Sequence, residues 1–283
     1  MSPHDLTTVS RVGFGAMQLE RLSDDAAAAH ALLRRAVELG IDHIDTAQFY
    51  GNGVVNAFLH DALRSDDDVV IVSKVGADPN PEGPVRLRAA QRPEELRASV
   101  EANLIALGVE CIPVVNLRRL DRRPGLQAEG DQIVDLDDQL AEMIRMRDEG
   151  MIGAIGLSTV TLDGLRRAIP AGIVCVQNAY SLANRDDEEM LAFCVENGIA
   201  WVPYFPLGSA FPQIPKVVDR PAVQEAANRL GFTPSQIGLA WLLNHEPSIL
   251  LIPGTADIAH LEANVAAGEI VFDAETMAAL EAE

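Results

Sequence analysis

The residues of this sequence best suited to acid–base chemistry are Asp45, Tyr50 and Lys74. Lysine is scarce, occurring only at positions 74 and 216. Lys74 follows the apolar run Val69–Ser73, which is a predicted strand. Successive side chains of a strand point to opposite faces, so Lys74 should lie on the same face as Val70 and Val72. A buried ammonium without an anionic partner costs several kcal/mol. Asp45, which ends the predicted strand Ile41–Asp45, can supply that anion.

Tyr50 stands five residues after Asp45. An ammonium beside it would stabilise the phenolate, so its pKa of about 10 is expected to fall toward neutrality. Such a tyrosine can protonate a carbonyl oxygen while a cofactor delivers hydride. The alternative is a purely structural Asp45–Lys74 ion pair, with Tyr50 on a surface loop.

The elements that must position these residues alternate regularly along the chain. Eight short apolar runs, predicted to be strands, are each followed by a helical pattern, which indicates a parallel sheet with right-handed crossovers. We expect one closed (β/α)8 TIM barrel, an α/β fold, over residues 1–283. The predicted strands are Arg11–Met17, Ile41–Asp45, Val69–Lys74, Ile112–Leu117, Ile152–Leu157, Ile173–Asn178, Ile199–Tyr204 and Ile249–Ile252.

A doubly wound open sheet is the alternative fold. It should carry a G-x-G-x-x-G turn after an early strand. Gly13 and Gly15 are present, but the third glycine is missing. The closed barrel therefore fits better.

The charge balance bears on the kind of partner. The 22 basic and 42 acidic residues give a net charge of −20, which repels phosphate backbones and anionic membranes. Cys111, Cys175 and Cys194 have no short spacing and are predicted to be core residues in a reducing compartment. The N-terminal residues lack signal-peptide features, so a cytoplasmic protein is expected. No histidine spacing indicates a metal site.

Polar residues stand at nearly every predicted strand end. In α/β barrels the C-terminal strand ends carry the function. Here they are Asp45, Lys74, Asn116–Arg118, Ser158, Gln177–Asn178, Tyr204 and Pro253–Thr255.

Six segments resemble, in order, those of the aldo-keto reductase superfamily, and the resemblance covers essentially the whole chain. They are GIDHIDTAQFYG (Gly40–Gly51), SKVG (Ser73–Gly76), GLST (Gly156–Thr159), QNAYS (Gln177–Ser181), YFPLGSA (Tyr204–Ala210) and the run Phe232–Thr255.

The resemblance implies a role for each matching residue. Tyr50 would donate the proton, tuned by Lys74 and Asp45, with NADPH as the expected cofactor and NADH possible. Ser158 and Gln177 would bind the nicotinamide amide, and Tyr204 would stack on its ring. The other implied cofactor contacts are Asp45 itself, Met17 on the ribose side, Leu207 and Gly208 at the pyrophosphate, and Gly254, Thr255, His260 and Asn264 around the adenosine phosphate and adenine.

One departure concerns the fourth strand. The family usually reads Y-Q-L-H-R there, whereas this chain reads V-N-L-R-R and places Arg118 in the histidine position. Arginine does not titrate, but its five fixed donors can orient a carbonyl oxygen or hold an anionic group. A branch resembling pyridoxal reductases also reads N-L-R. The alternative is a relative that has lost catalysis.

A second departure concerns the 2′-phosphate of NADPH. No lysine or arginine occurs from Leu230 to Glu283. The remaining candidates are His260, Lys216 and Arg220, together with a helix N-terminus near Gly254–Thr255, where free N–H groups can bind phosphate.

These observations favour NADPH-dependent reduction of a small polar aldehyde or ketone, with a pyridoxal-like compound as a candidate. A second interpretation is a regulatory or sensing subunit that binds the nucleotide with little turnover. A third, a lyase or aldolase using Lys74 as a Schiff base, requires a neutral amine, whereas Asp45 would keep it charged.

Overall fold

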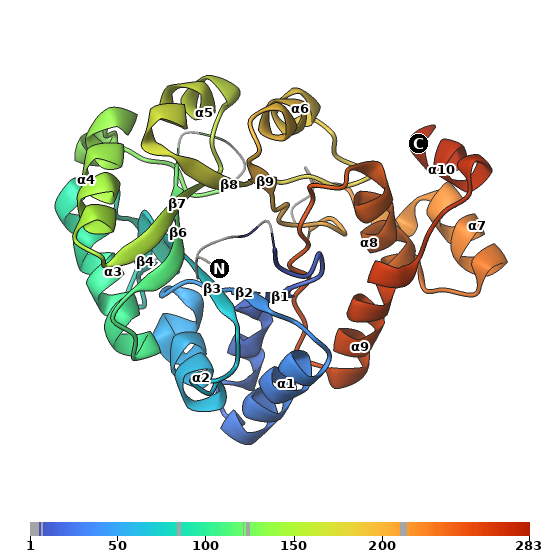
Figure 1. Ribbon diagram of the computed structural model, residues 1–283, viewed down its shortest axis with the longest axis horizontal. Helices are drawn as coiled ribbons and strands as arrows, with labels where there is room; N and C mark the ends of the chain where they lie inside the picture. Colours follow the sequence, from blue (N-terminus) through green and yellow to red (C-terminus); the bar gives the residue numbers. More distant parts are fainter. Residues whose placement is uncertain (1–5, 7, 84–85, 121, 123–124, 210–213) are drawn as a thin grey trace.

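The computed structural model describes residues 6, 8–83, 86–120, 122, 125–209 and 214–283. Its centre is a curled parallel sheet of seven strands, surrounded by helices (Figure 1). The strands follow one another in chain order around the sheet. They are β1 (Phe14–Gly15), β2 (His43–Asp45), β3 (Val70–Val75), β6 (Ile112–Arg118), β7 (Ile152–Ser158), β8 (Ile173–Gln177) and β9 (Ala200–Trp201).

The eighth predicted strand closes the ring but is much shorter than expected. Its segment makes two isolated parallel bridges, Trp201–Ile249 and Val12–Leu251. Close backbone contact completes the closure, since a Cβ built on Gly15 would lie 2.4 Å from the Ile252 carbonyl oxygen. The predicted (β/α)8 barrel is confirmed, with two bridges in place of a continuous last strand.

The helices lie outside the barrel, and several of them begin at a residue whose side chain caps the first turn. For example, the Asp25 side chain accepts the Ala28 N–H at the start of α1. The helices are α1 (Ala26–Glu38), α2 (Val54–Ala62), α3 (Pro93–Leu107), α4 (Leu136–Asp148), α5 (Leu162–Ala168), α6 (Glu188–Glu196), α7 (Pro221–Leu230), α8 (Pro234–His245), α9 (Ile258–Ala266) and α10 (Ala274–Glu281). Among the described residues, none of these helices has the length and apolarity that crossing a bilayer requires.

An antiparallel hairpin of β4 (Ala77–Pro79) and β5 (Leu87–Ala89) was not predicted. It begins two residues after β3 and therefore stands at the barrel end that carries Lys74. The backbone N–H of Ala90 donates to the Gly76 carbonyl at 3.2 Å, which fixes the hairpin to the strand end.

Two apolar layers hold the barrel together. The larger one lies between the sheet and the helices and includes the fully buried Trp201 and Trp241. The smaller one fills the barrel interior and consists of Leu6, Val72, Val114, Ala154, Cys175, Val202, Leu250 and Ile252. Toward the C-terminal strand ends, polar residues replace this interior layer, and the site is built there.

Candidate active site

Lys74 lies at the centre of a polar cluster at the end of β3. Its Nζ donates to Asp45 Oδ1, to the Thr46 carbonyl at 3.1 Å and to the Tyr50 hydroxyl at 3.2 Å. Lys74 is 6% exposed and Asp45 is 3% exposed. The three N–H groups of the ammonium thus have one acceptor each. The structure therefore brings together the three residues singled out for acid–base chemistry.

Gln177 completes the environment of the Asp45 carboxylate. From the end of β8, its Nε2 donates to Asp45 Oδ2 at 2.6 Å. Its Oε1 is buried and has no hydrogen-bond partner among the described residues. A buried carbonyl without a donor costs free energy. This oxygen can accept an N–H of a bound amide, which fits the carboxamide of a nicotinamide ring.

The electrostatics of the cluster correct one expectation. Burial alone would lower the pKa of Lys74, but Asp45 and Tyr50 outweigh it, and the pKa is raised. The pKa of Tyr50 is also raised, because burial outweighs the lowering effect of Lys74 and Arg118. The predicted fall toward neutrality is therefore wrong. The Tyr50 hydroxyl keeps its proton at neutral pH and can act as a donor.

The backbone after β2 places Tyr50 over Lys74. The Tyr50 N–H donates to the Ala47 carbonyl at 3.0 Å, which forms a tight turn. Gly51, Asn52 and Gly53 then adopt φ values of 55°, 54° and 93°. This left-handed run suits glycine and asparagine and reverses the chain into α2.

Arg118 ends β6 opposite Ser158 of β7. Its guanidinium lies 5.7 Å from the centre of the Phe49 ring, and no carboxylate of the described residues pairs with it. Burial lowers its pKa, while the electrostatic effects of Tyr50 and Tyr204 oppose that. Arg118 is thus a partly buried cation near Tyr50 that lacks an anionic partner on the described part of the chain.

Tyr204 follows β9 and approaches β7 through Thr159. The Thr159 Oγ1 lies 3.4 Å from the Tyr204 hydroxyl and 3.5 Å from Ser158 Oγ. Thr159 and Phe205 have φ values of 58° and 56°, a left-handed conformation that is costly for a β-branched or bulky residue. Thr159 was missed from sequence, although it follows Ser158 directly within the GLST segment.

The residues assigned to the distal part of the cofactor are more dispersed. Met17 is 41% exposed on the 3₁₀ helix Ala16–Leu22. A Cβ built on Gly208 would lie 2.2 Å from the Pro215 carbonyl oxygen, so the backbone of Leu207–Gly208 packs closely on the segment that precedes Lys216. Ala210, the end of the YFPLGSA segment, lies outside the described residues.

The N-terminus of α9 is already capped by an acidic residue. Asp257 accepts the His260 N–H at 2.9 Å, and Thr255 Oγ1 accepts the Asp257 N–H at 3.0 Å. The His260 side chain is 79% exposed, and Gly254 is exposed while Asn264 is partly buried. No interaction between described residues links Lys216 or Arg220 to His260 or Asn264.

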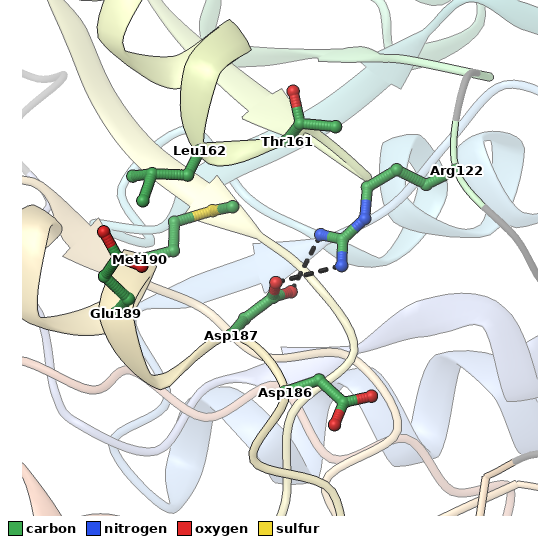
Figure 2. A pocket seen from close by; sticks show the side chains of 7 residues that line it. All are labelled: Arg122, Thr161, Leu162, Asp186, Asp187, Glu189 and Met190. Atoms are coloured by element: carbon green, nitrogen blue, oxygen red, sulfur yellow. Dashed lines mark hydrogen bonds and ion pairs between the residues drawn. The ribbon is translucent and has the colours of Figure 1, made fainter.

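A hollow borders the same end of the barrel (Figure 2). Its walls come from the loops after β6, β7 and β8, and Arg122 makes two hydrogen bonds of 2.9 Å to Asp187 there. Asn178 Nδ2 also donates to Asp187, at 2.8 Å. Because Arg122 and Asp187 neutralise each other, this cluster ties the loops together. Within the described ranges, no three histidine, cysteine or acidic residues gather as metal ligands would.

Comparison with known proteins agrees with the fold. The sequence model of the Aldo/keto reductase family matches residues 11–282. The chain is 39% identical over 281 residues to pyridoxine 4-dehydrogenase of Escherichia coli (strain K12), covering 97% of this chain and 94% of that protein.

Solved structures give the same assignment. An aldo-keto reductase from Klebsiella pneumoniae in complex with NADPH has a TM-score of 0.79 and 26% identity, covering 97% of this chain and 90% of that one. An aldo/keto reductase from the same organism in complex with NADP and acetate has a TM-score of 0.80 and 26% identity, covering 97% and 91%. The resemblance of the six segments is confirmed, and the chain belongs to the aldo/keto reductase family.

Proposed function

We propose that this chain, acting as one barrel over residues 1–283, reduces a small polar aldehyde or ketone to its alcohol with NADPH. The observation that carries the proposal is the cluster in which Lys74 donates to both Asp45 and Tyr50 at the strand ends. NADPH is chosen because it is bound in a similar reductase from Klebsiella pneumoniae.

Each residue of the cluster has a separate task in this proposal. NADPH, when bound, supplies the hydride. Tyr50 holds a proton at its hydroxyl and gives it to the carbonyl oxygen of the substrate. Lys74 stabilises the phenolate that remains, and Asp45 keeps Lys74 charged. Gln177 fixes the second oxygen of Asp45.

The cofactor contacts follow from the same positions. The Oε1 of Gln177, which has no partner among the described residues, would bind the nicotinamide amide together with Ser158, its partner in the sheet register. Tyr204 would stack on the ring. Met17 would line the ribose side and Asp45 would also contact the cofactor, while Leu207 and Gly208 would approach the pyrophosphate. The adenosine end would be held by Gly254, Thr255, His260 and Asn264, with Lys216 or Arg220 contributing to the 2′-phosphate.

Arg118 and the similar pyridoxine 4-dehydrogenase together support a pyridoxal-like substrate. Arg118 stands near Tyr50 and has no carboxylate partner among the described residues. Its guanidinium can donate to the carbonyl oxygen or to a neighbouring phenolic oxygen, which an aromatic hydroxyaldehyde presents side by side. A bulky apolar ketone would leave this cation without a partner.

The proposal is tested by following NADPH oxidation with an aldehyde panel that includes pyridoxal. Wild-type protein is expected to turn over at least the polar members. Tyr50→Phe should lower kcat by about 100-fold or more, the scale of losing a general acid, with cofactor affinity nearly retained. Tight NADPH binding without turnover of any aldehyde would instead favour a nucleotide-sensing subunit. Full turnover by Tyr50→Phe would remove Tyr50 from the proton-donor role.

A further inference from the structure

Four fully buried polar side chains lie behind the barrel wall, next to the active-site cluster. Thr46 follows Asp45, and Ser73 precedes Lys74. By strand alternation both face the helices when their neighbours face the interior. They meet Asn56 of α2 and Asn103 of α3, and all four side chains are 0% exposed. This polar group lies beside the large apolar cluster between the sheet and the helices.

The four side chains form a continuous hydrogen-bonded path. Thr46 Oγ1 donates to Asn56 Oδ1 at 2.7 Å, and Asn56 Nδ2 donates to Asn103 Oδ1 at 3.1 Å. Ser73 Oγ donates to the same Asn103 oxygen at 2.6 Å. Asn103 Nδ2 donates to the Ser99 carbonyl at 2.7 Å, which anchors the path within α3. The residue after Asp45 is thereby connected to the residue before Lys74.

Asn56 also holds the loop that carries Tyr50. Its Nδ2 makes a second donation, to Gln48 Oε1 at 2.7 Å. A Cβ built on Gly53 would lie 2.8 Å from Gln48 Nε2, so the loop packs tightly against the left-handed run after Tyr50. One carboxamide on α2 thus contacts the strand end at Thr46 and the loop that ends at Tyr50.

The energetic cost of burying these four polar side chains indicates that their hydrogen bonds fix how the surrounding elements are arranged. Apolar residues of similar size would fill the same layer without needing partners, whereas a buried carboxamide is costly unless its donors and acceptors are satisfied. Here both Asn56 and Asn103 use their oxygen and their amide nitrogen. Satisfied buried networks fix one relative arrangement of the elements that they join.

We propose that Asn56 and Asn103 are positioning residues that hold the ends of β2 and β3 and the Tyr50 loop in one register. Lys74 Nζ then stays within hydrogen-bonding distance of Asp45, the Thr46 carbonyl and the Tyr50 hydroxyl at once. The catalytic consequence of this rests on the proposed reductase function. A displacement of about 1 Å would break these contacts, and misplacement on that scale can cost about 100-fold in rate.

The first test compares kinetics and stability in the full chain. Asn56→Ala removes the side chain that connects Thr46, Asn103 and Gln48. The nearly isosteric Thr46→Val removes only the hydrogen bond from Thr46 to Asn56, with little change in packing, whereas Thr46→Ser keeps the hydroxyl. Asn244→Ala is the matched control, because the Asn244 side chain also makes three hydrogen bonds, to Ala240, Ile270 and Phe272, away from the cluster. Melting temperatures show which variants are folded.

The expected result separates positioning from general stability. Asn56→Ala and Thr46→Val should lose about 10- to 100-fold in kcat, with the alkaline limb of the pH–rate profile moved upward because Lys74 no longer lowers the Tyr50 pKa. Thr46→Ser should retain the wild-type profile. Asn244→Ala should lose stability and keep kcat and pH profile. A Thr46→Val protein that is folded and behaves as Asn244→Ala does would overturn the proposal.

A second measurement does not depend on turnover. Because the chain has only two lysines, ¹³Cε-lysine labelling gives two signals, and Lys216→Arg assigns that of Lys74. In Asn56→Ala and Thr46→Val, Lys74 should titrate at lower pH than in wild type, since burial would no longer be compensated by close contact with Asp45. An unchanged Lys74 titration would reject the positioning role. A changed one in a protein that reduces no aldehyde would reject only the reductase function.

Discussion

Gln177 Nε2 donates to Asp45 Oδ2 at 2.6 Å, although the two residues are 132 positions apart in the chain. The contact spans the barrel mouth from β8 to β2. It occupies the amide nitrogen of Gln177 and leaves its Oε1 buried without a partner among the described residues. In the proposed function, this one side chain both orients Asp45 and offers an acceptor to the cofactor.

Replacing Gln177 by methionine tests both parts of that relationship. Asp45 Oδ2 would lose its donor inside the protein, which should lower the free energy of unfolding by about 1–3 kcal/mol. Cofactor affinity should fall as well, because the acceptor at Oε1 is lost. Urea denaturation and fluorescence titration with NADPH measure the two effects separately.

Gln139→Met provides the control for this substitution. Gln139 is also fully buried, and its Nε2 donates to the Gln91 carbonyl at 2.6 Å, with no contact to Asp45. It should lose stability while binding NADPH like the wild type. If both variants bound NADPH equally well, Gln177 would have no part in the cofactor site.

The raised pKa of Tyr50 predicts the pH dependence of the reaction. A proton donor must be protonated, so activity is present at low pH and is lost as pH rises through the pKa of the free enzyme. Because burial raises that pKa from its ordinary value of about 10, kcat/KM should stay flat through neutral pH and decline only in strongly alkaline solution. A decline centred near neutrality would show that Lys74 lowers the pKa of Tyr50 by more than burial raises it.

Much of the fold could be predicted from local patterns. The seven strands of the sheet lie within or near the predicted runs, and the helices follow the strands in the predicted alternation. The β4–β5 hairpin was missed because each of its strands has only three residues, one of them charged. Glycine and proline are also frequent in the neighbouring sequence, which is more typical of a loop. The last strand was overestimated because an apolar run does not show how many of its residues pair.

The site was predictable only in part for a similar reason. Residue type, strand parity and family resemblance indicated Asp45, Tyr50 and Lys74. The sign of the Tyr50 pKa shift depends on how burial balances Lys74, which only a three-dimensional arrangement determines. Asn56 and Asn103 read as ordinary polar positions of amphipathic helices, and nothing in their spacing shows that their side chains meet behind the barrel wall.

Cofactor preference is a further prediction. NADPH should bind more tightly than NADH through Thr255 and His260, with Lys216 or Arg220 reaching the 2′-phosphate. Fluorescence titration with both nucleotides measures the difference, and His260→Ala should reduce it. Equal affinities would mean that this chain has no 2′-phosphate pocket, as expected if Asp257, which caps α9, repels the phosphate.

Arg118 gives the last prediction, which concerns the substrate. Arg118→Leu should lower kcat/KM for pyridoxal by about 10- to 100-fold, the scale of losing a hydrogen bond from a charged group. It should change kcat/KM less for an apolar aldehyde, which offers the guanidinium only its carbonyl oxygen. Arg118→Lys should restore only part of the loss, because an ammonium lacks the planar fork of donors.

Stability separates a substrate contact from a structural role in this series. The Arg118 guanidinium is partly buried, lies 5.7 Å from the centre of the Phe49 ring and pairs with no carboxylate of the described residues. Removing it relieves the cost of burying an unpaired charge, so Arg118→Leu should be as stable as the wild type or more stable. Arg118→His restores the residue usual in the family and should raise activity on apolar aldehydes relative to polar ones. If Arg118→Leu reduces pyridoxal as well as the wild type does, Arg118 takes no part in substrate recognition, and the argument for a polar, pyridoxal-like substrate loses its structural basis.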